Sequence, residues 1–242
     1  MSEVTGWMEP EVAMRRLLLV VILVSLVAQC GQEPFQTARE TMVQTQIVAR
    51  GVKDTATLRA MRTVPRHEFV PRDWMHRAYD DSPLPIGYDQ TISQPYIVAF
   101  MTELIQPHRG QRVLEVGTGS GYQAAVLSEI VDSVFTIELI PELRETAAAC
   151  LTRLGYRNVI TSQGDGYMGW PEHAPFDGIL VTAAADGIPQ PLVRQLKDGG
   201  VMVIPVGSVL GVQSLTVVRK KGNDVTTESV LPVRFVPLIH PH

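Results

Sequence analysis

From Arg112 onward, short apolar runs alternate with stretches in which apolar residues recur at helical spacing. The apolar runs are rich in β-branched residues and predict buried strands at 112–117, 133–139, 158–165, 176–184 and 201–207. The stretches between them predict helices at 122–131, 141–155 and 189–200. Because strand–helix alternation builds βαβ units, the pattern predicts an α/β fold. Its sheet is doubly wound and mostly parallel, with helices on both faces.

The flanking regions follow other patterns. Residues 41–51 predict a helix that ends at Gly51, and Asp54 can cap a second helix that stops before Pro65. Residues 65–90 are rich in Pro, Gly and Asp, which favours loops with short helical turns. At 213–238, alternating residues surround a Gly-Asn-Asp turn. That arrangement predicts a hairpin, so the sheet should end in antiparallel strands.

Residues 1–30 have the composition of a secretory leader. Arg15 and Arg16 precede the apolar run Leu17–Ala28, which is too short to span a bilayer as a helix. Cys30 is then a candidate for lipid attachment. The alternatives are an upstream extension from a misassigned start codon and an apolar N-terminal helix without a targeting role. Residues 31–242 are expected to form one domain, with a helical and loop-rich part at 38–110 and the sheet at 111–242.

Charge and cysteine content exclude some classes of function. The 242-residue chain has a net charge of −4 and a pI of about 5.9, whereas nucleic-acid-binding surfaces carry a basic excess. The two cysteines and six histidines show no spacing typical of metal ligands. We therefore expect neither a nucleic-acid partner nor a metal.

A glycine-rich turn, LEVGTGSGYQ at 114–123, follows a predicted strand and opens a predicted helix. Glycines at 117, 119 and 121 permit a sharp turn and close approach of the backbone to a ligand. Tyr122 stands where a dinucleotide-binding fingerprint requires Gly or Ala, and the turn lacks the lysine of a P-loop. These differences disfavour a pyrophosphate ligand.

Two carboxylates follow the next predicted strands. Glu138 lies about twenty residues beyond the glycine turn, where an acid can accept both hydroxyls of a ribose. Asp165 lies at the carboxyl end of a strand, the edge at which open α/β sheets bind ligands, and could recognise an adenine. Three such features on successive strands indicate an adenosine ligand without phosphates, and S-adenosylmethionine (AdoMet) fits best.

The stretch GYDQTISQPYIV at 87–98 leaves three interpretations of Ser93 open: a nucleophile, a helix cap and a clamp on a substrate. A hydrolytic nucleophile is disfavoured because the chain has no GxSxG elbow. Pro95 favours a helix start, so that Ser93 or Gln94 could cap the helix.

The chain resembles the protein-L-isoaspartate O-methyltransferase family. The resemblance rests on AMRTVPRHEFVP, AYDDSPLPIGYDQTISQPYIVAFMTE, VLEVGTGSGYQAAVLSEI, NVITSQGDGYMGWPEHAPFDGILVTAAA and VRFVPL, and it extends from about residue 42 to 238. It implies the Rossmann-like fold of class I AdoMet-dependent methyltransferases. The implied reaction methylates the α-carboxylate of L-isoaspartyl residues in damaged proteins and peptides, which begins their repair.

The resemblance also assigns roles to residues. It places the cofactor on Glu115, Gly117, Thr118, Gly119, Gly121, Glu138, Asp165, Gly166, Gln90 and Thr91. It assigns catalysis to Ser93, and the substrate to Ile92, Ser93 and Val236. It further implies a monomer, and a cytoplasmic location where AdoMet is made, with export or membrane tethering through residues 14–30 as the alternative.

The expected chemistry needs no general base, because a carboxylate acceptor is already ionised at pH 7. We therefore interpret Ser93 as a neutral donor that orients the acceptor. Asp89 stands where the family usually has Gly; Asp tolerates a left-handed backbone, but its charge near an anionic substrate is unfavourable. The alternatives are methylation of a small-molecule carboxylate and a non-catalytic binding module that retains the fold.

Overall fold

The computed structural model describes residues 35–208 and 211–240. The leader-like segment 1–30, with Cys30, lies outside these residues. The chain divides into two units, residues 1–37 and 38–242, and the site described below belongs entirely to the second. Within the described residues, no helix has both the length and the apolarity needed to cross a membrane.

A seven-stranded sheet forms the centre of the second unit, in the order β5-β4-β3-β6-β7-β8-β9. The five strands from β5 to β7 are parallel, and β8 and β9 are antiparallel to their neighbours. This confirms the predicted mostly parallel sheet and its C-terminal hairpin. The strands are β3 (Arg112–Val116), β4 (Ser133–Glu138), β5 (Val159–Gln163), β6 (Phe176–Val181), β7 (Leu196–Val206), β8 (Gln213–Lys221) and β9 (Asp224–Val233).

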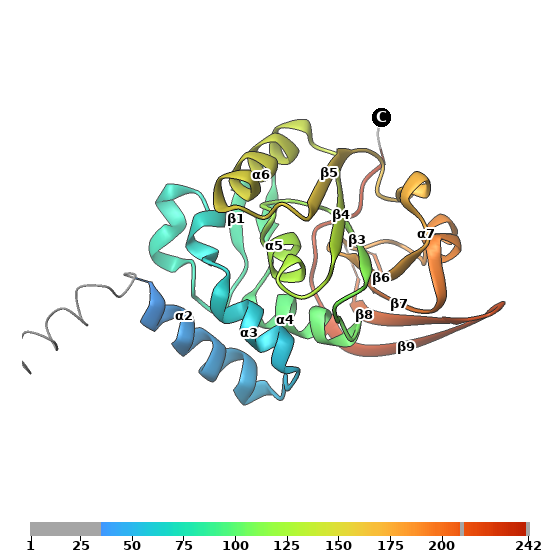
Figure 1. Ribbon diagram of the computed structural model, residues 1–242, viewed down its shortest axis with the longest axis horizontal. Coiled ribbons are helices and arrows are strands. Elements are labelled where there is room, and N and C mark those ends of the chain that lie inside the picture. The colour runs from blue at the N-terminus through green and yellow to red at the C-terminus, as the bar shows by residue number, and fades with distance from the viewer. Residues whose placement is uncertain (1–34, 209–210, 241–242) are drawn as a thin grey trace, which may run out of the picture. The chain divides into compact units, whose positions relative to one another are not determined.

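Three helices connect the parallel strands: α5 (Tyr122–Ser128), α6 (Pro141–Leu154) and α7 (Gln190–Gln195). The chain moves in one direction along the sheet through α5 and α6, and in the other through α7. With right-handed crossovers the two sets cover opposite faces, and Figure 1 shows α7 apart from α5 and α6. Apolar side chains of β3, β4 and β6, such as Leu114, Phe135 and Val181, pack with α7 residues in one buried cluster.

The prediction of a helix over 189–200 was wrong in its second half. The helix α7 ends at Gln195, and residues from Leu196 onward belong to β7. Leu196 pairs with Phe176 of β6 and is almost completely buried, so its apolar side chain contributes to the core as part of a strand. Gly199 has a φ of 79°, which a helix does not permit.

The N-terminal part begins with three consecutive helical elements: α2 (Gln36–Met42), the π-helix η1 (Val43–Ile47) and the 3₁₀-helix η2 (Val48–Arg50). They end at Gly51, whose φ of 92° confirms the predicted C-terminal glycine. The next helix, α3 (Thr55–Thr63), is capped as predicted, because the Asp54 carboxylate accepts the Thr57 N–H at 2.6 Å.

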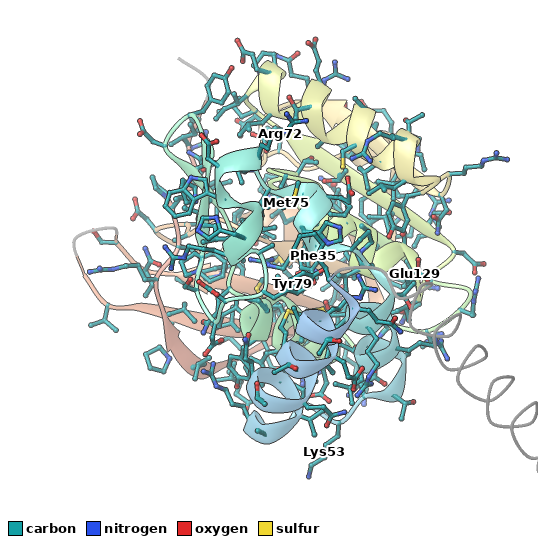
Figure 2. The ribbon with its side chains drawn as sticks, turned by 90° about the vertical axis from the view of Figure 1, so that its left-hand side faces the viewer. Phe35, Lys53, Arg72, Met75, Tyr79 and Glu129 are labelled. Carbon is teal, nitrogen blue, oxygen red and sulfur yellow. The ribbon has the colours of Figure 1, made fainter. Side chains whose placement is uncertain are left out.

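Between α3 and the sheet, the predicted loop contains two 3₁₀-helices, η3 (Arg66–Phe69) and η4 (Arg72–Arg77). In Figure 2 the segment with Arg72, Met75 and Tyr79 lies between the viewer and the strands. A small hairpin follows, formed by β1 (Leu84–Gly87) and β2 (Gln90–Ile92). The helix α4 (Pro95–Leu104) then leads to β3, and η5 (Pro171–His173) lies between β5 and β6.

The hairpin turn settles two expectations for 87–98. Tyr88 and Asp89 have φ of 53° and 55°, so Asp89 does occupy the left-handed conformation expected of it. Positive φ at both central residues is typical of a type I′ turn. The capping interpretation was wrong: Gln94 is the N-cap of α4, and neither its side chain nor that of Ser93 caps the helix. Pro95 fits the first turn without a cap, since it has no N–H to satisfy.

Candidate active site

A cavity opens at the carboxyl ends of β3, β4 and β6. Together with the space that is open to solvent, it spans about 800 Å³. All of the predicted site residues line it except Gly121 and Asp165. Those that do are Gln90, Thr91, Ile92, Ser93, Glu115, Gly117, Thr118, Gly119, Glu138, Gly166 and Val236. Segments far apart in the sequence therefore meet at one place.

The glycine turn follows β3 directly and is held by backbone hydrogen bonds. The Gly117 and Thr118 N–H groups both donate to the Ile137 carbonyl, at 2.8 and 3.1 Å. Gly117 has a φ of 96°, and a Cβ there would lie 2.5 Å from the Thr182 hydroxyl. That hydroxyl donates to the Gly117 carbonyl at 2.7 Å. Glycine is thus required at 117 by both conformation and space.

Gly121 has a different role from the one predicted. It is the left-handed N-cap of α5, with a φ of 86°. A Cβ there would lie 3.3 Å from Ala147 and Leu151 of α6. Gly121 is absent from the cavity lining, and it allows α5 and α6 to pack closely.

Glu138 ends β4 and is nearly buried, with 7% of its surface exposed. One carboxylate oxygen accepts the Gly119 N–H at 2.8 Å and the other accepts the Ile140 N–H at 3.0 Å. Each oxygen retains acceptor capacity toward a ligand hydroxyl in the cavity. Glu138 therefore also fixes the glycine turn, a role that the sequence pattern did not indicate.

Glu115 is fully buried beneath the glycine turn. Its Oε2 accepts the Thr136 hydroxyl at 2.5 Å, and the Thr136 and Thr118 hydroxyls lie 2.7 Å apart. Its Oε1 is buried and has no partner among the described residues. Burial raises the pKa of Glu115 to about 8, because a charged carboxylate loses its hydration there. A cationic group bound in the cavity would favour the ionised form.

Asp165 lies just outside the cavity lining. Its carboxylate accepts the Tyr167 N–H at 2.9 Å and lies 3.3 Å from Nδ1 of His240. The His240 ring stacks on Tyr167, with centroids 3.9 Å apart. Gly166 lines the cavity instead, and a Cβ at that position would lie 2.5 Å from Val116. The backbone at Gly166 can therefore approach a ligand closely.

The C-terminal segment 236–239 lines the cavity, and of this segment only Ile239 lies beyond the VRFVPL motif that contains the predicted Val236. It is held beside the end of β6, because the Ala184 N–H donates to the Val236 carbonyl and the Leu238 N–H donates to the Ala184 carbonyl. Tyr122 and Thr182 were also missed. Thr182 could have been found, since it lies near the carboxyl end of the strand predicted at 176–184, at the ligand-binding edge.

Ser93 lies where this cavity meets a second, adjoining groove. The groove is lined by Pro83, Thr91, Ser93, Gln94, Ile97, Thr182 and residues 232–237. The Ser93 hydroxyl makes no hydrogen bond to any residue in the described part of the chain, while its carbonyl accepts from Arg66 Nη2 at 2.7 Å.

Asp89 is exposed in the hairpin turn and lines neither the cavity nor the groove. Residues 35–208 and 211–240 contain no cluster of three or more potential metal ligands.

Known proteins resemble this chain over nearly its whole length. A family model described as protein-L-isoaspartate(D-aspartate) O-methyltransferase matches residues 37–242. A protein from Opitutus terrae, named protein-L-isoaspartate O-methyltransferase, is 53% identical over 92% of this chain and 96% of its own length. A protein from Syntrophobacter fumaroxidans, named protein-L-isoaspartate O-methyltransferase 2, is 51% identical over 93% of this chain and 96% of its own.

Two solved structures share the fold. One, titled protein-L-isoaspartate O-methyltransferase, is 33% identical with a TM-score of 0.76, covering 82% of this chain. The present chain spans 65% of the length of that structure. The other, from Plasmodium falciparum in complex with S-adenosyl-L-homocysteine, is 24% identical with a TM-score of 0.72. It covers 86% of this chain and 99% of its own.

Proposed function

The chain belongs to the protein-L-isoaspartate(D-aspartate) O-methyltransferase family, and we propose that it methylates the α-carboxylate of L-isoaspartyl residues in damaged proteins and peptides. AdoMet is the methyl donor. The labile ester then collapses to a succinimide, which reopens in part to normal aspartate. The observation that carries the proposal is the position of Ser93, which lines both the cavity and the adjoining groove and whose hydroxyl has no hydrogen-bond partner in the described part of the chain.

The residues around the cavity fit AdoMet. Glu138 would accept the ribose hydroxyls, Gly117–Gly119 would approach the ligand through their backbone, and Gly166 with Asp165 would contact the adenine. Gln90 and Thr91 would contribute from the hairpin side. The carboxyl of Glu115, which lines the cavity, would face the positively charged part of the ligand. When bound, AdoMet supplies an electrophilic methyl group on a sulfonium.

The acceptor needs positioning rather than activation. An isoaspartyl α-carboxylate is ionised at neutral pH, so no base has to remove a proton. Ser93 would donate a hydrogen bond to one carboxylate oxygen and leave the other free to attack. Holding two reactants in a near-attack geometry can contribute roughly 7–11 kcal/mol. Ile92 and Val236, which line the same cavity as Ser93, would exclude water.

The groove favours a peptide over a small carboxylate. It is lined in part by residues 232–237, which begin in the last residues of the edge strand β9 and continue beyond it. An extended peptide can lie along such a segment. We further propose that the enzyme is a cytoplasmic monomer, since AdoMet is made in the cytoplasm.

Transfer of a tritiated methyl group tests the function. The substrates are an isoaspartyl peptide and its aspartyl twin, which have the same composition and charge. We expect base-labile label on the isoaspartyl peptide alone. Equal labelling of both peptides, or labelling of neither in a protein that binds S-adenosylhomocysteine, would contradict the proposal.

A further inference from the structure

Arg66, the first residue of η3, carries a positive charge in the interior of the protein. None of its surface is exposed. Burial lowers its pKa to about 10, which still leaves it charged at neutral pH. No carboxylate in the described part of the chain forms an ion pair with it, and its Nη1 has no hydrogen-bond partner there. Burying an arginine without a counter-ion is costly, so its presence calls for a role other than stability.

The contacts of Arg66 join three segments that are distant in the sequence. Its Nε donates to the Ala78 carbonyl and its Nη2 donates to the Ser93 carbonyl, both at 2.7 Å. Its guanidinium lies over the ring of Tyr122, 4.7 Å from the centroid, at a distance typical of a cation–π contact. The guanidinium thus reaches the loop after η4, the end of β2 and the first turn of α5.

Two of these three contacts lead directly to the cavity. Ser93 and Tyr122 both line it, one from the acceptor side and one from the helix that follows the glycine turn. The Tyr122 ring is also fixed from its edge by Phe69, with centroids 5.7 Å apart in a T-shaped arrangement. Arg66 therefore connects the backbone that presents the Ser93 hydroxyl to a residue next to the cofactor loop.

We propose that Arg66 is a positioning residue for methyl transfer, which holds the acceptor loop at Ser93 in register with the first turn of α5. This inference rests on the proposed function. Arginine suits the role because its planar fork donates in fixed directions while its face stacks on an aromatic ring. Lysine could retain the charge but not all three contacts. Misplacing a reacting group by about 1 Å can cost roughly 100-fold in rate.

The test is a double-mutant cycle with Arg66→Lys and Ser93→Ala, assayed on an isoaspartyl peptide. For Arg66→Lys we expect kcat to fall about 10- to 100-fold, with the Kd for S-adenosylhomocysteine within about twofold of wild type. Because Arg66 acts through Ser93, the double variant should lose little more than the worse single variant. Arg62→Lys, whose arginine pairs with Glu40 at the surface, is the matched control and should retain wild-type kcat.

Additive losses in the cycle would overturn the inference, because a residue that only stabilises the fold would not couple to Ser93. A loss confined to cofactor affinity would also overturn it. If Arg66→Lys does not fold, a cycle of Tyr122→Leu with Ser93→Ala tests the same connection through the aromatic partner of Arg66. Additive losses of kcat in that cycle would also overturn the inference. Failure of the wild type to methylate isoaspartyl peptides would instead reject the proposed function.

Discussion

The two walls of the cavity are built in different ways. The cofactor wall, residues 115–120 with Glu138, lies at the ends of adjacent parallel strands and is held by backbone hydrogen bonds to the neighbouring strand. The acceptor wall, residues 90–93 with 236–239, comes from two short segments that are far apart in the sequence. Backbone hydrogen bonds to Ala184 hold the second segment, and side chains that donate to backbone carbonyls add to them, as Arg66 does to Ser93 and Tyr167 does to Leu238.

This difference has a functional meaning. A wall made of strand ends is rigid and gives the ligand-binding edge that many α/β proteins share. A wall made of loops can differ between proteins without disturbing the sheet. We infer that the first wall determines which donor binds and the second determines which acceptor is methylated. Variants on the two walls should therefore separate donor affinity from turnover.

The largest effect is expected on the acceptor wall. Ser93→Ala should lower kcat for an isoaspartyl peptide by one to three orders of magnitude, roughly 1.4 to 4 kcal/mol, because the carboxylate loses its donor. Affinity for S-adenosylhomocysteine should stay nearly intact. Steady-state kinetics and calorimetry measure the two quantities. Ser133→Ala, at the amino end of β4, is the control and should retain wild-type kcat. A Ser93→Ala enzyme with wild-type kcat/KM would show that Ser93 has no part in the mechanism.

On the cofactor wall we expect donor affinity, rather than turnover, to be the quantity that falls. Glu138→Ala should weaken S-adenosylhomocysteine binding by about 1.5–3 kcal/mol, since the ribose loses a charged acceptor and the Gly119 N–H loses its partner. Isothermal titration calorimetry measures this change. Glu142→Ala, at an exposed carboxylate in the first turn of α6, should bind normally. Unchanged affinity in Glu138→Ala would count against its assignment.

The buried carboxylate of the cofactor wall predicts a dependence of stability on pH. The pKa of Glu115 is raised from 4.5 to about 8 in the folded protein, so the folded state retains a proton that the unfolded chain loses. Glu115 therefore destabilises the fold progressively as pH rises from about 4.5 to 8. Relative to Glu115→Gln, the wild type should lose roughly 2–3 kcal/mol of unfolding free energy between pH 5.5 and 7.5. Urea unfolding of both proteins at the two pH values measures this change. If the difference in unfolding free energy between wild type and Glu115→Gln is the same at both pH values, the prediction is wrong.

The smallest effect is expected at the hairpin turn. Asp89→Gly should relieve a left-handed φ and raise the unfolding free energy by up to about 1 kcal/mol. Because Asp89 lines neither the cavity nor the groove, KM for an isoaspartyl peptide should change less than about twofold. A much larger fall in KM would place the Asp89 charge near the substrate after all.

The sequence pattern located the cofactor wall directly, whereas the acceptor residues were assigned through the family resemblance, and this difference has a physical reason. Apolar periodicity locates strands, and strand ends locate Glu115, the glycine turn and Glu138. No periodicity connects Arg66 to Ser93 or Leu238 to Ala184, because these contacts depend on how loops fold over the sheet. The error at 189–200 has a similar origin: Leu196 fits a helical pattern, yet pairing with Phe176 places it in β7. The close packing of Gly121 against α6 could not be foreseen, because a glycine needed for packing and one needed for a ligand look alike in sequence.

A ternary structure with S-adenosylhomocysteine and an isoaspartyl peptide tests the central claim most directly, namely that donor and acceptor meet at Ser93. We predict that Ser93 Oγ lies within about 3 Å of one α-carboxylate oxygen, with the peptide in the groove and the adenosine between Glu138 and Gly166. The account would be contradicted if the α-carboxylate were bound away from Ser93, or if the peptide left the groove along 232–237 empty.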